Sequence, residues 1–182
     1  MNYPSICFDR YYMPGFDIAA TDLCLSQDYK LFDGTIFRKG AKYFTFPEIK
    51  ALLWRLELLG QISDECDIPT DEECEQIIAQ YGWKDGVCRS NNLASELGLG
   101  YYGYIGIISS IDAYSRAPRD FHYSQALGYG VNGSYWCRGT GEHEGEAMIL
   151  HLNSKGRPMI CKDVIGNGAN IGCSVRLIRR RR

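Results

Sequence analysis

The chain lacks the features that mark membrane-spanning and zinc-binding proteins. Among its 182 residues, no apolar run approaches the roughly 20 residues that a membrane-spanning helix needs. It has only three histidines, and no two cysteines are separated by two residues, so zinc-site spacing is absent. Residues 1–5 have neither the basic nor the apolar region of a secretory signal peptide. We therefore expect no membrane insertion, no metal, no cofactor, and synthesis in the cytosol without signal-directed secretion.

Positive charge is scarce except at the end of the chain. The formal net charge is −2, and the four consecutive arginines from Arg179 to Arg182 contribute +4 to it. The rest of the chain is therefore net acidic, which argues against a nucleic-acid-binding domain. We expect the arginine run to be a solvated tail, with contact to phosphates or to an acidic partner as the alternative.

The composition is that of one globular domain with a short appendage. Hydrophobic residues make up 45% and charged residues 23% of the chain, which is typical of folded proteins. Twenty glycines and thirteen tyrosines favour a loop-rich, partly β structure. The eight cysteines could form a disulfide framework, but without a signal peptide we expect free thiols.

Residues 1–44 contain short strand patterns and no helix. The patterns lie at residues 11–13, 17–20, 30–32, 35–37 and 42–44. Asp33-Gly34 between two of them predicts a hairpin, because Asp-Gly supplies the positive φ angles of a tight turn. We assign residues 1–44 to a strand and hairpin segment for attachment or oligomerisation, and residues 45–182 to a ligand-binding domain.

Two amphipathic helices follow the N-terminal segment. Thr45 with Glu48, and Thr70 with Glu73, have capping-box spacing. Gly60 and Gly82 are natural helix ends. Residues of one helical face form the apolar stripe of each helix: Ile49, Leu52, Leu53 and Leu56 in the first, and Cys74, Ile77, Ile78 and Tyr81 in the second. The acidic residues 64–75 lack the ligand spacing of a calcium loop, so we attribute them to helix capping.

The C-terminal half has a β pattern with long connections. A short helical turn is predicted at residues 91–97, and a glycine-rich strand at 99–108. Residues 109–134 form a long polar and aromatic loop, which is usually functional or ordered by a partner. Strands are expected at 133–138, 147–153, 158–161 and 173–178, with polar loops at 139–145 and 166–170.

Five phrases occur in an informative order. They are Ile68-Pro69-Thr70-Asp71-Glu72-Glu73, Gly103-Tyr104, Tyr135-Trp136-Cys137-Arg138, Ala147-Met148-Ile149-Leu150 and Gly172-Cys173-Ser174-Val175-Arg176-Leu177-Ile178-Arg179. Residues 45–179 thereby resemble the C-type-lectin-like fold, and more narrowly the Fibrobacter succinogenes major paralogous domain and the variable proteins of diversity-generating retroelements. Two serines usual in the third phrase are replaced by Cys137 and Arg138.

The resemblance implies an α+β fold, with two helices packed on a twisted antiparallel sheet with long loops. The N-terminal β-hairpin segment is additional to it. The calcium-binding phrases of sugar-binding C-type lectins, Glu-Pro-Asn or Gln-Pro-Asp with Trp-Asn-Asp, are absent. Formylglycine-generating enzymes share this fold family, and Cys137 with Cys161 keeps that alternative open.

The resemblance places ligand recognition between the Trp136 strand and the final strand. Trp136 is expected in the core, so its neighbour Tyr135 is expected on the opposite, exposed face. His143 with its neighbouring glutamates is interpreted as a recognition loop rather than an acid–base pair. The predicted ligand-binding surface comprises Tyr135, Arg138, Thr140, His143, Glu144, Asn153, Lys155, Arg157, Asn167 and Asn170, with Tyr114, Arg116, Arg119, His122 and Tyr123 as additional candidates.

These patterns favour a non-catalytic recognition protein. The first hypothesis is a phage virion protein, in a tail fibre, head fibre or decoration, of the kind found in Bacteroidetes phages. It would assemble in the host cytoplasm, form a homo-oligomer, and bind a host-surface protein or glycan or another virion protein. A bacterial surface or secreted lectin-like adhesin is the alternative, and an enzyme of the formylglycine-generating type is a third hypothesis.

Overall fold

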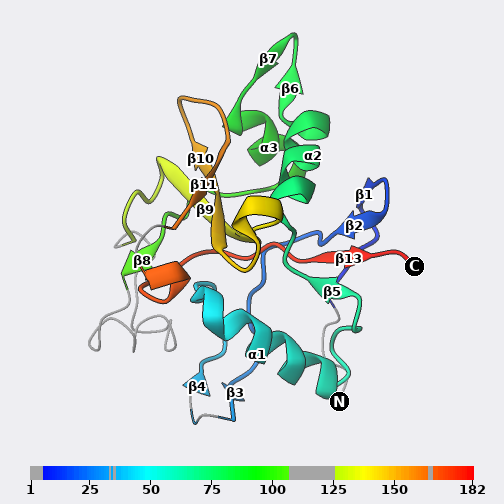
Figure 1. The fold of residues 1–182 in the computed structure, drawn as a ribbon, viewed down its shortest axis with the longest axis vertical. Helices are drawn as coiled ribbons and strands as arrows, with labels where there is room; N and C mark the ends of the chain where they lie inside the picture. The colour runs from blue at the N-terminus through cyan, green and yellow to red at the C-terminus, as the bar shows by residue number, and fades with distance from the viewer. Residues whose placement is uncertain (1–5, 33, 35, 107–125, 164–165) are drawn as a thin grey trace.

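The protein has an α+β fold, as the sequence predicts (Figure 1). A computed structural model describes residues 6–182 except 33, 35, 107–125 and 164–165. Within these residues, the helices are α1 (Phe46–Leu58), α2 (Asp71–Tyr81) and α3 (Ser90–Leu97). They pack on several small antiparallel sheets.

One sheet brings the two ends of the chain together. It has the strand order β1 (Tyr11–Met13), β2 (Phe16–Ile18), β13 (Ile178–Arg180) and β5 (Cys66–Asp67). All three pairings are antiparallel. Residues on either side of β1 and β2, such as Phe8 and Leu23, belong to the same buried cluster as Trp136. The described part of the N-terminal segment therefore shares a core with the C-terminal half.

A second sheet contains the two longest described strands, β9 (Asn132–Arg138) and β10 (Ala147–Asn153), which are buried on both faces. Its order is β11 (Met159–Lys162), β10 and β9. Trp136 and the α1 side chains bury one face, whereas Tyr135 packs on the other face with residues of α2 and α3. In Figure 1, α1 lies on one side of this sheet and the pair α2 and α3 on the other.

Short elements complete the described structure. The predicted hairpin at residue 34 is confirmed, because the strands that flank it pair in an antiparallel ladder. The short strands form three two-stranded ladders: β3 (Tyr29–Lys30) with β4 (Ile36–Phe37), β6 (Trp83–Lys84) with β7 (Val87–Cys88), and β8 (Ile105–Gly106) with β12 (Ile171–Gly172). Two 3₁₀ turns, η3 (Gly141–His143) and η4 (Gly166–Gly168), lie in the C-terminal connections.

The predicted capping box is present in α2 and absent in α1. Thr70 Oγ1 accepts a hydrogen bond from the Glu73 N–H at 3.1 Å, and Glu73 Oε1 accepts one from the Thr70 N–H at 2.9 Å. Thr45 makes no such bond, so the prediction for α1 is wrong. Pro47 occupies the second position of α1 and has no N–H, which removes one of the two donors that an N-cap oxygen normally accepts from.

Three other predictions are corrected. The expected turn at residues 91–97 is an eight-residue helix, α3, which Gly98 ends at φ +67°. The expected strand at 42–44 contributes one bridge, between Phe44 and Cys173. The closing strand begins at Ile178 rather than Cys173, because the buried residues before it form only isolated bridges, whereas Ile178 pairs with both β2 and β5.

The terminal arginines are not a solvated tail. Arg179 pairs with the buried Asp17 at 3.0 Å, Arg180 with Glu73 at 2.6 Å, and Arg182 with Asp64 at 2.8 Å. These acidic residues come from β2, α2 and the segment before β5. The arginine run therefore begins within β13 and pairs with carboxylates of three separate segments, which its one-sign charge pattern did not reveal.

Candidate functional site

The structure divides the predicted ligand-binding residues between two ends of one sheet. Asn153 lies opposite Asn132 at one end of the β9–β10 ladder, and Arg138 lies opposite Ala147 at the other. Seven extended residues separate these ends by about 20 Å. Lys155 and Arg157 therefore belong to a different surface from Arg138, Thr140 and the η3 turn (Figure 1).

The prediction that Tyr135 is exposed is wrong. Its side chain is 2% exposed, because the face of β9 that opposes Trp136 is covered as fully as the Trp136 face. Its hydroxyl donates to Asp22 Oδ2 at 2.7 Å and accepts from the Gly100 N–H at 2.8 Å. Burial, followed by the Asp22 charge, raises the pKa of Tyr135 well above its ordinary value.

Asp22 joins Tyr135 to the buried Arg176 in a polar network. Arg176 Nε donates to Asp22 Oδ1 at 2.8 Å, and Nη1 donates to the carbonyls of Ala19 at 3.0 Å and Leu97 at 2.7 Å. Nη2 donates to the Gly98 carbonyl at 3.2 Å. Arg176 thus supplies donors to carbonyls at the C-terminal end of α3, where a cation also complements the helix dipole. This Tyr135–Asp22–Arg176 network is framework rather than ligand surface.

At one end of the sheet, the turn between β10 and β11 carries two exposed cations. The Asn153 amide donates to Asn132 at 3.2 Å and its oxygen accepts from the Lys155 N–H at 2.9 Å, so Asn153 is used to shape the turn. The Arg157 guanidinium lies 5.5 Å from the ring centroid of Trp83 on the β6–β7 hairpin. Trp83 is 50% exposed, which makes this end a small aromatic and cationic surface.

Residues at the opposite end make mostly local contacts. His143 Nδ1 lies 2.8 Å from Glu146, and Lys162 Nζ lies 2.9 Å from the same carboxylate. Hydrogen bonds from Lys162 and then His143 lower the pKa of Glu146. The Thr140 hydroxyl donates to Asp71. Glu144 is exposed, so this end presents a charged, solvated loop.

In the connection from β11 to β12, the predicted ligand-binding residue Asn167 makes a hydrogen bond within the protein. The Asn167 side-chain oxygen accepts from the Ala147 N–H at 2.7 Å, and Asn167 has a positive φ of 48°. Gly168 follows it, where a Cβ would lie 2.4 Å from Phe46 Cβ. Asn167 thus ties this connection to β10 and Gly168 lies against α1, whereas Asn170 is exposed.

Arg138 reaches a groove beside α1 that contains no other predicted residue. The groove has a volume of about 390 Å³. We call it the α1 groove, and it is lined by Lys50, Leu53, Trp54, Glu57, Ile62, Cys66, Asp67 and Arg138. Trp54 is 51% exposed, and its ring centroid lies 4.9 Å from that of Phe32, which is 70% exposed. The groove therefore has an exposed aromatic wall beside charged groups.

The charged wall of the α1 groove is held in place by several contacts. Arg138 Nη2 lies 3.0 Å from Asp67 Oδ1, and Arg138 Nε donates to the same carboxylate at 3.2 Å. The Arg138 guanidinium also lies 5.7 Å from the Phe46 ring centroid. Bidentate pairing with a carboxylate and stacking on an aromatic ring both restrict the orientation of a guanidinium. Arg138 is thus a preorganised polar contact.

Trp54 can be recognised in the sequence as a large apolar residue outside the buried stripe of α1. Ile49, Leu52, Leu53 and Leu56 are buried, as predicted. Trp54 lies off this stripe, as does the exposed Leu58 four residues later. Large apolar residues outside the buried face of a helix indicate an interaction surface when they gather with others.

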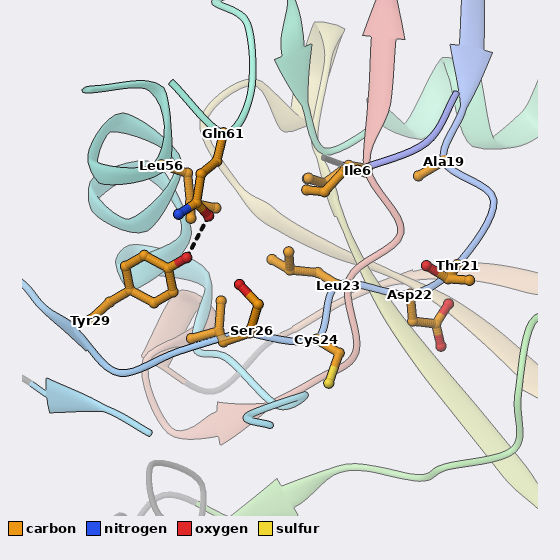
Figure 2. Close-up of a pocket in the computed structure, with 12 residues that line it drawn as sticks. Ile6, Ala19, Thr21, Asp22, Leu23, Cys24, Ser26, Tyr29, Leu56 and Gln61 are labelled. Atoms are coloured by element: carbon orange, nitrogen blue, oxygen red, sulfur yellow. Dashed lines mark hydrogen bonds between the residues drawn. The ribbon is translucent and has the colours of Figure 1, made fainter. Parts of the chain in front are cut away.

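A smaller cavity lies inside the protein, between the N-terminal segment and the end of α1 (Figure 2). Its volume is about 170 Å³, and its wall includes the apolar Ile6 and Leu23 and the polar Ser26. Figure 2 shows the hydroxyl of Tyr29 and the side chain of Gln61 facing each other across a hydrogen bond. Gln61 Nε2 has no hydrogen-bond partner within the described residues. A mixed cavity of this kind suits bound water better than a macromolecular ligand.

The environments of three cysteines, Cys74, Cys161 and Cys173, oppose a reactive thiolate. All eight cysteines are free thiols. Burial raises the pKa of Cys161 and Cys173, and a hydrogen bond with Cys137 together with burial raises that of Cys74. A reactive thiol has a lowered pKa, so these shifts have the opposite direction.

Some predictions concern residues outside the described part of the chain. These are the additional candidates Tyr114, Arg116, Arg119, His122 and Tyr123. Across the described residues, no group of three or more histidine, cysteine, aspartate or glutamate side chains is arranged to hold a metal ion. The described helices also include none with the length and apolar character needed to cross a membrane.

Comparisons of the chain with protein-family profiles, with curated proteins and with solved structures gave no match.

Proposed function

We propose that this protein is a non-catalytic, C-type-lectin-like recognition domain that binds a host-surface glycan through the α1 groove. The observation that carries the proposal is the half-exposed Trp54 in a groove whose other wall is the fixed Arg138–Asp67 pair. Tryptophan supplies a large, rigid contact area at low entropic cost, and the polar pair supplies hydrogen-bond donors and acceptors.

The balance of charge in the groove favours a neutral glycan over a charged ligand. Lys50 and Arg138 line the groove together with Glu57 and Asp67, so its formal charges cancel. A sugar ring offers an apolar face for Trp54 and hydroxyl groups that both donate and accept hydrogen bonds. A protein receptor is the other outcome of a binding test.

The C-type-lectin-like part of the proposal is supported by the structural roles of the sequence phrases that carry the resemblance. Trp136 is fully buried, and the Ser174-Val175-Arg176 phrase is buried beside it. The Pro-Thr phrase provides the N-cap of α2 at Thr70. The final phrase leads into β13, which lies at the centre of a four-stranded sheet between β2 and β5.

Within this proposal, the protein is a component of a phage virion. The resemblance to the variable proteins of diversity-generating retroelements is the basis for that location, and a bacterial surface adhesin is the alternative. Capsid or tail genes next to this gene, and the protein in purified particles by mass spectrometry, are the expected findings. Recovery only from the surface fraction of uninfected bacteria would instead identify an adhesin.

The binding experiment uses the purified chain on a glycan array and on whole bacterial cells. We expect saturable binding to a restricted set of neutral glycans, and competition between those glycans and the cells. If the protein gives no signal on the array and protease treatment of the cells abolishes its binding to them, the ligand is a protein receptor and not a glycan. No saturable binding to either would contradict a recognition function for this chain.

A further inference from the structure

Phe32, in the turn between β3 and β4, is the most exposed large apolar side chain in the described part of the chain, at 70%. The preceding residue, Leu31, is buried in the main core cluster, so Leu31 makes the core contact of this turn. The Phe32 ring centroid instead lies 4.9 Å from that of Trp54, with 34° between the ring planes. Phe32 is therefore placed against the aromatic wall of the α1 groove and not in the core.

The Phe32 ring covers part of one face of the Trp54 indole. Two rings side by side in one plane cannot bring their centroids to 4.9 Å without a clash, so these rings overlap in part. The residues that line the α1 groove include Trp54 and not Phe32. Phe32 thus lies behind the indole as seen from the groove, which leaves the opposite indole face for a ligand.

The hairpin that carries Phe32 is anchored beside α1. Tyr29 and Phe37 lie opposite each other in the β3–β4 ladder, and both are buried in the same cluster as Leu56 of α1. The Tyr29 hydroxyl also donates to Gln61, which follows α1 (Figure 2). Figure 1 shows the hairpin next to α1. The backbone on either side of Phe32 is therefore fixed relative to the helix that carries Trp54.

A fixed Trp54 side chain would favour binding. The indole is 51% exposed on the outer side of α1, where a side chain without a contact can change rotamer. Ordering such a side chain when a ligand binds weakens the affinity by about twofold to tenfold. The Phe32 ring restricts the indole before a ligand arrives, just as Asp67 restricts Arg138 on the other wall. Both walls of the α1 groove are thereby preorganised.

We propose that Phe32 is a positioning residue for recognition in the α1 groove. Its ring holds the Trp54 indole with one face toward the groove, where that face stacks on a sugar ring and Arg138 donates to the sugar hydroxyls. This inference rests on the proposed binding of a neutral glycan. It adds the N-terminal hairpin, which is otherwise assigned to attachment or oligomerisation, to the recognition site.

The test compares the binding of three variants of the full chain to the neutral glycans of the array, in titrations with increasing protein concentration. Phe32→Ala should weaken binding by about threefold to tenfold with an unchanged melting temperature. Phe32→Tyr keeps the ring and should bind like the wild type. Ile36→Ala is the matched control, because it removes a 39% exposed apolar side chain from the same hairpin, and it should change binding by less than twofold.

Acrylamide quenching of tryptophan fluorescence provides a readout that needs no ligand. In a Trp83→Phe background, Trp54 is the exposed tryptophan, because Trp136 is fully buried. Phe32→Ala should increase the quenching of Trp54, since it uncovers one indole face, whereas Phe32→Tyr and Ile36→Ala should leave it unchanged.

Two results would overturn the positioning role and leave the proposed function intact. One is wild-type glycan binding by Phe32→Ala while Trp54→Ala loses binding. The other is equal weakening by Phe32→Ala and Ile36→Ala, which would indicate a general effect of the hairpin. A lower melting temperature of Phe32→Ala with unchanged binding would assign the ring a purely structural role. If the wild type binds no neutral glycan, the proposed function fails and this inference fails with it.

Discussion

Replacing Tyr135 with phenylalanine distinguishes a buried framework residue from a ligand contact. The Tyr135 hydroxyl donates to Asp22 and accepts from the Gly100 N–H, and its side chain is 2% exposed. Tyr135→Phe keeps the ring and removes only these two hydrogen bonds. The substitution removes the hydroxyl that is the hydrogen-bond partner of the Gly100 N–H and of one Asp22 oxygen.

The expected loss of stability follows from the burial of these groups. Leaving a buried hydrogen-bonding group unsatisfied costs about 1–3 kcal/mol, so we expect Tyr135→Phe to lower the free energy of unfolding by about 2 kcal/mol. For a chain of this length, 1 kcal/mol corresponds to about 2–4 °C in the melting temperature. The melting temperature should therefore fall by about 4–8 °C. Tyr81→Phe is the control, because the Tyr81 hydroxyl bonds the Tyr12 carbonyl in an exposed position and should change stability by less than about 0.5 kcal/mol.

The pH dependence of the free energy of unfolding provides a second test of the environment of Tyr135. Burial raises the pKa of Tyr135 in the folded protein, whereas an unfolded tyrosine has a pKa of about 10. Above that pH the unfolded chain loses this proton and the folded protein keeps it, so the stability of the wild type decreases as the pH rises. Tyr135→Phe should make this alkaline decrease shallower. Denaturant titrations from neutral to alkaline pH measure both effects, and an unchanged melting temperature together with an unchanged alkaline slope would refute the buried network.

Two further predictions concern the helix cap and the thiols. Thr70→Ala should lower the free energy of unfolding by about 1 kcal/mol, because it removes the oxygen that caps α2, and Thr70→Ser should restore most of it. Equal stability of the two variants in urea would count against the cap. In thiol titration of the folded protein, the exposed Cys7 and Cys24 should react first, and the exposed Cys161 should react more slowly because burial of its thiol raises its pKa. The five buried cysteines should react only on unfolding. Rapid reaction of a buried cysteine would reopen the enzymatic alternative.

Local patterns predicted the elements whose stability is mainly local. The second helix, its capping box and its glycine end follow from residues within one segment, and the structure has them at Thr70, Glu73 and Gly82. The strand at residues 147–153 has the predicted bounds. Capping and short-range periodicity depend on neighbours in sequence, so they can be recognised before the tertiary structure is known.

The errors arose where a distant segment decided the outcome. Strand alternation correctly placed Tyr135 and Trp136 on opposite faces, but it carried no information on how many faces are covered. The arginine run could not be recognised as paired, because its carboxylates lie at residues 17, 64 and 73. The role of Trp54 does not follow from the α1 sequence, because the apolar stripe accounts for the burial of the helix without it.

The most direct test of the proposed recognition site compares two equally exposed tryptophans. Trp54 in the α1 groove is 51% exposed and Trp83 on the β6–β7 hairpin is 50% exposed, so each can be changed to alanine at a similar cost in surface area. The measurement is the dissociation constant of each variant for the glycan or cell that the wild type binds. We predict that Trp54→Ala weakens binding by tenfold or more, at least about 1.4 kcal/mol, and that Trp83→Ala changes it by less than twofold. Wild-type affinity in Trp54→Ala, with loss of binding in Trp83→Ala, would contradict the α1 groove and move recognition to the opposite end of the sheet.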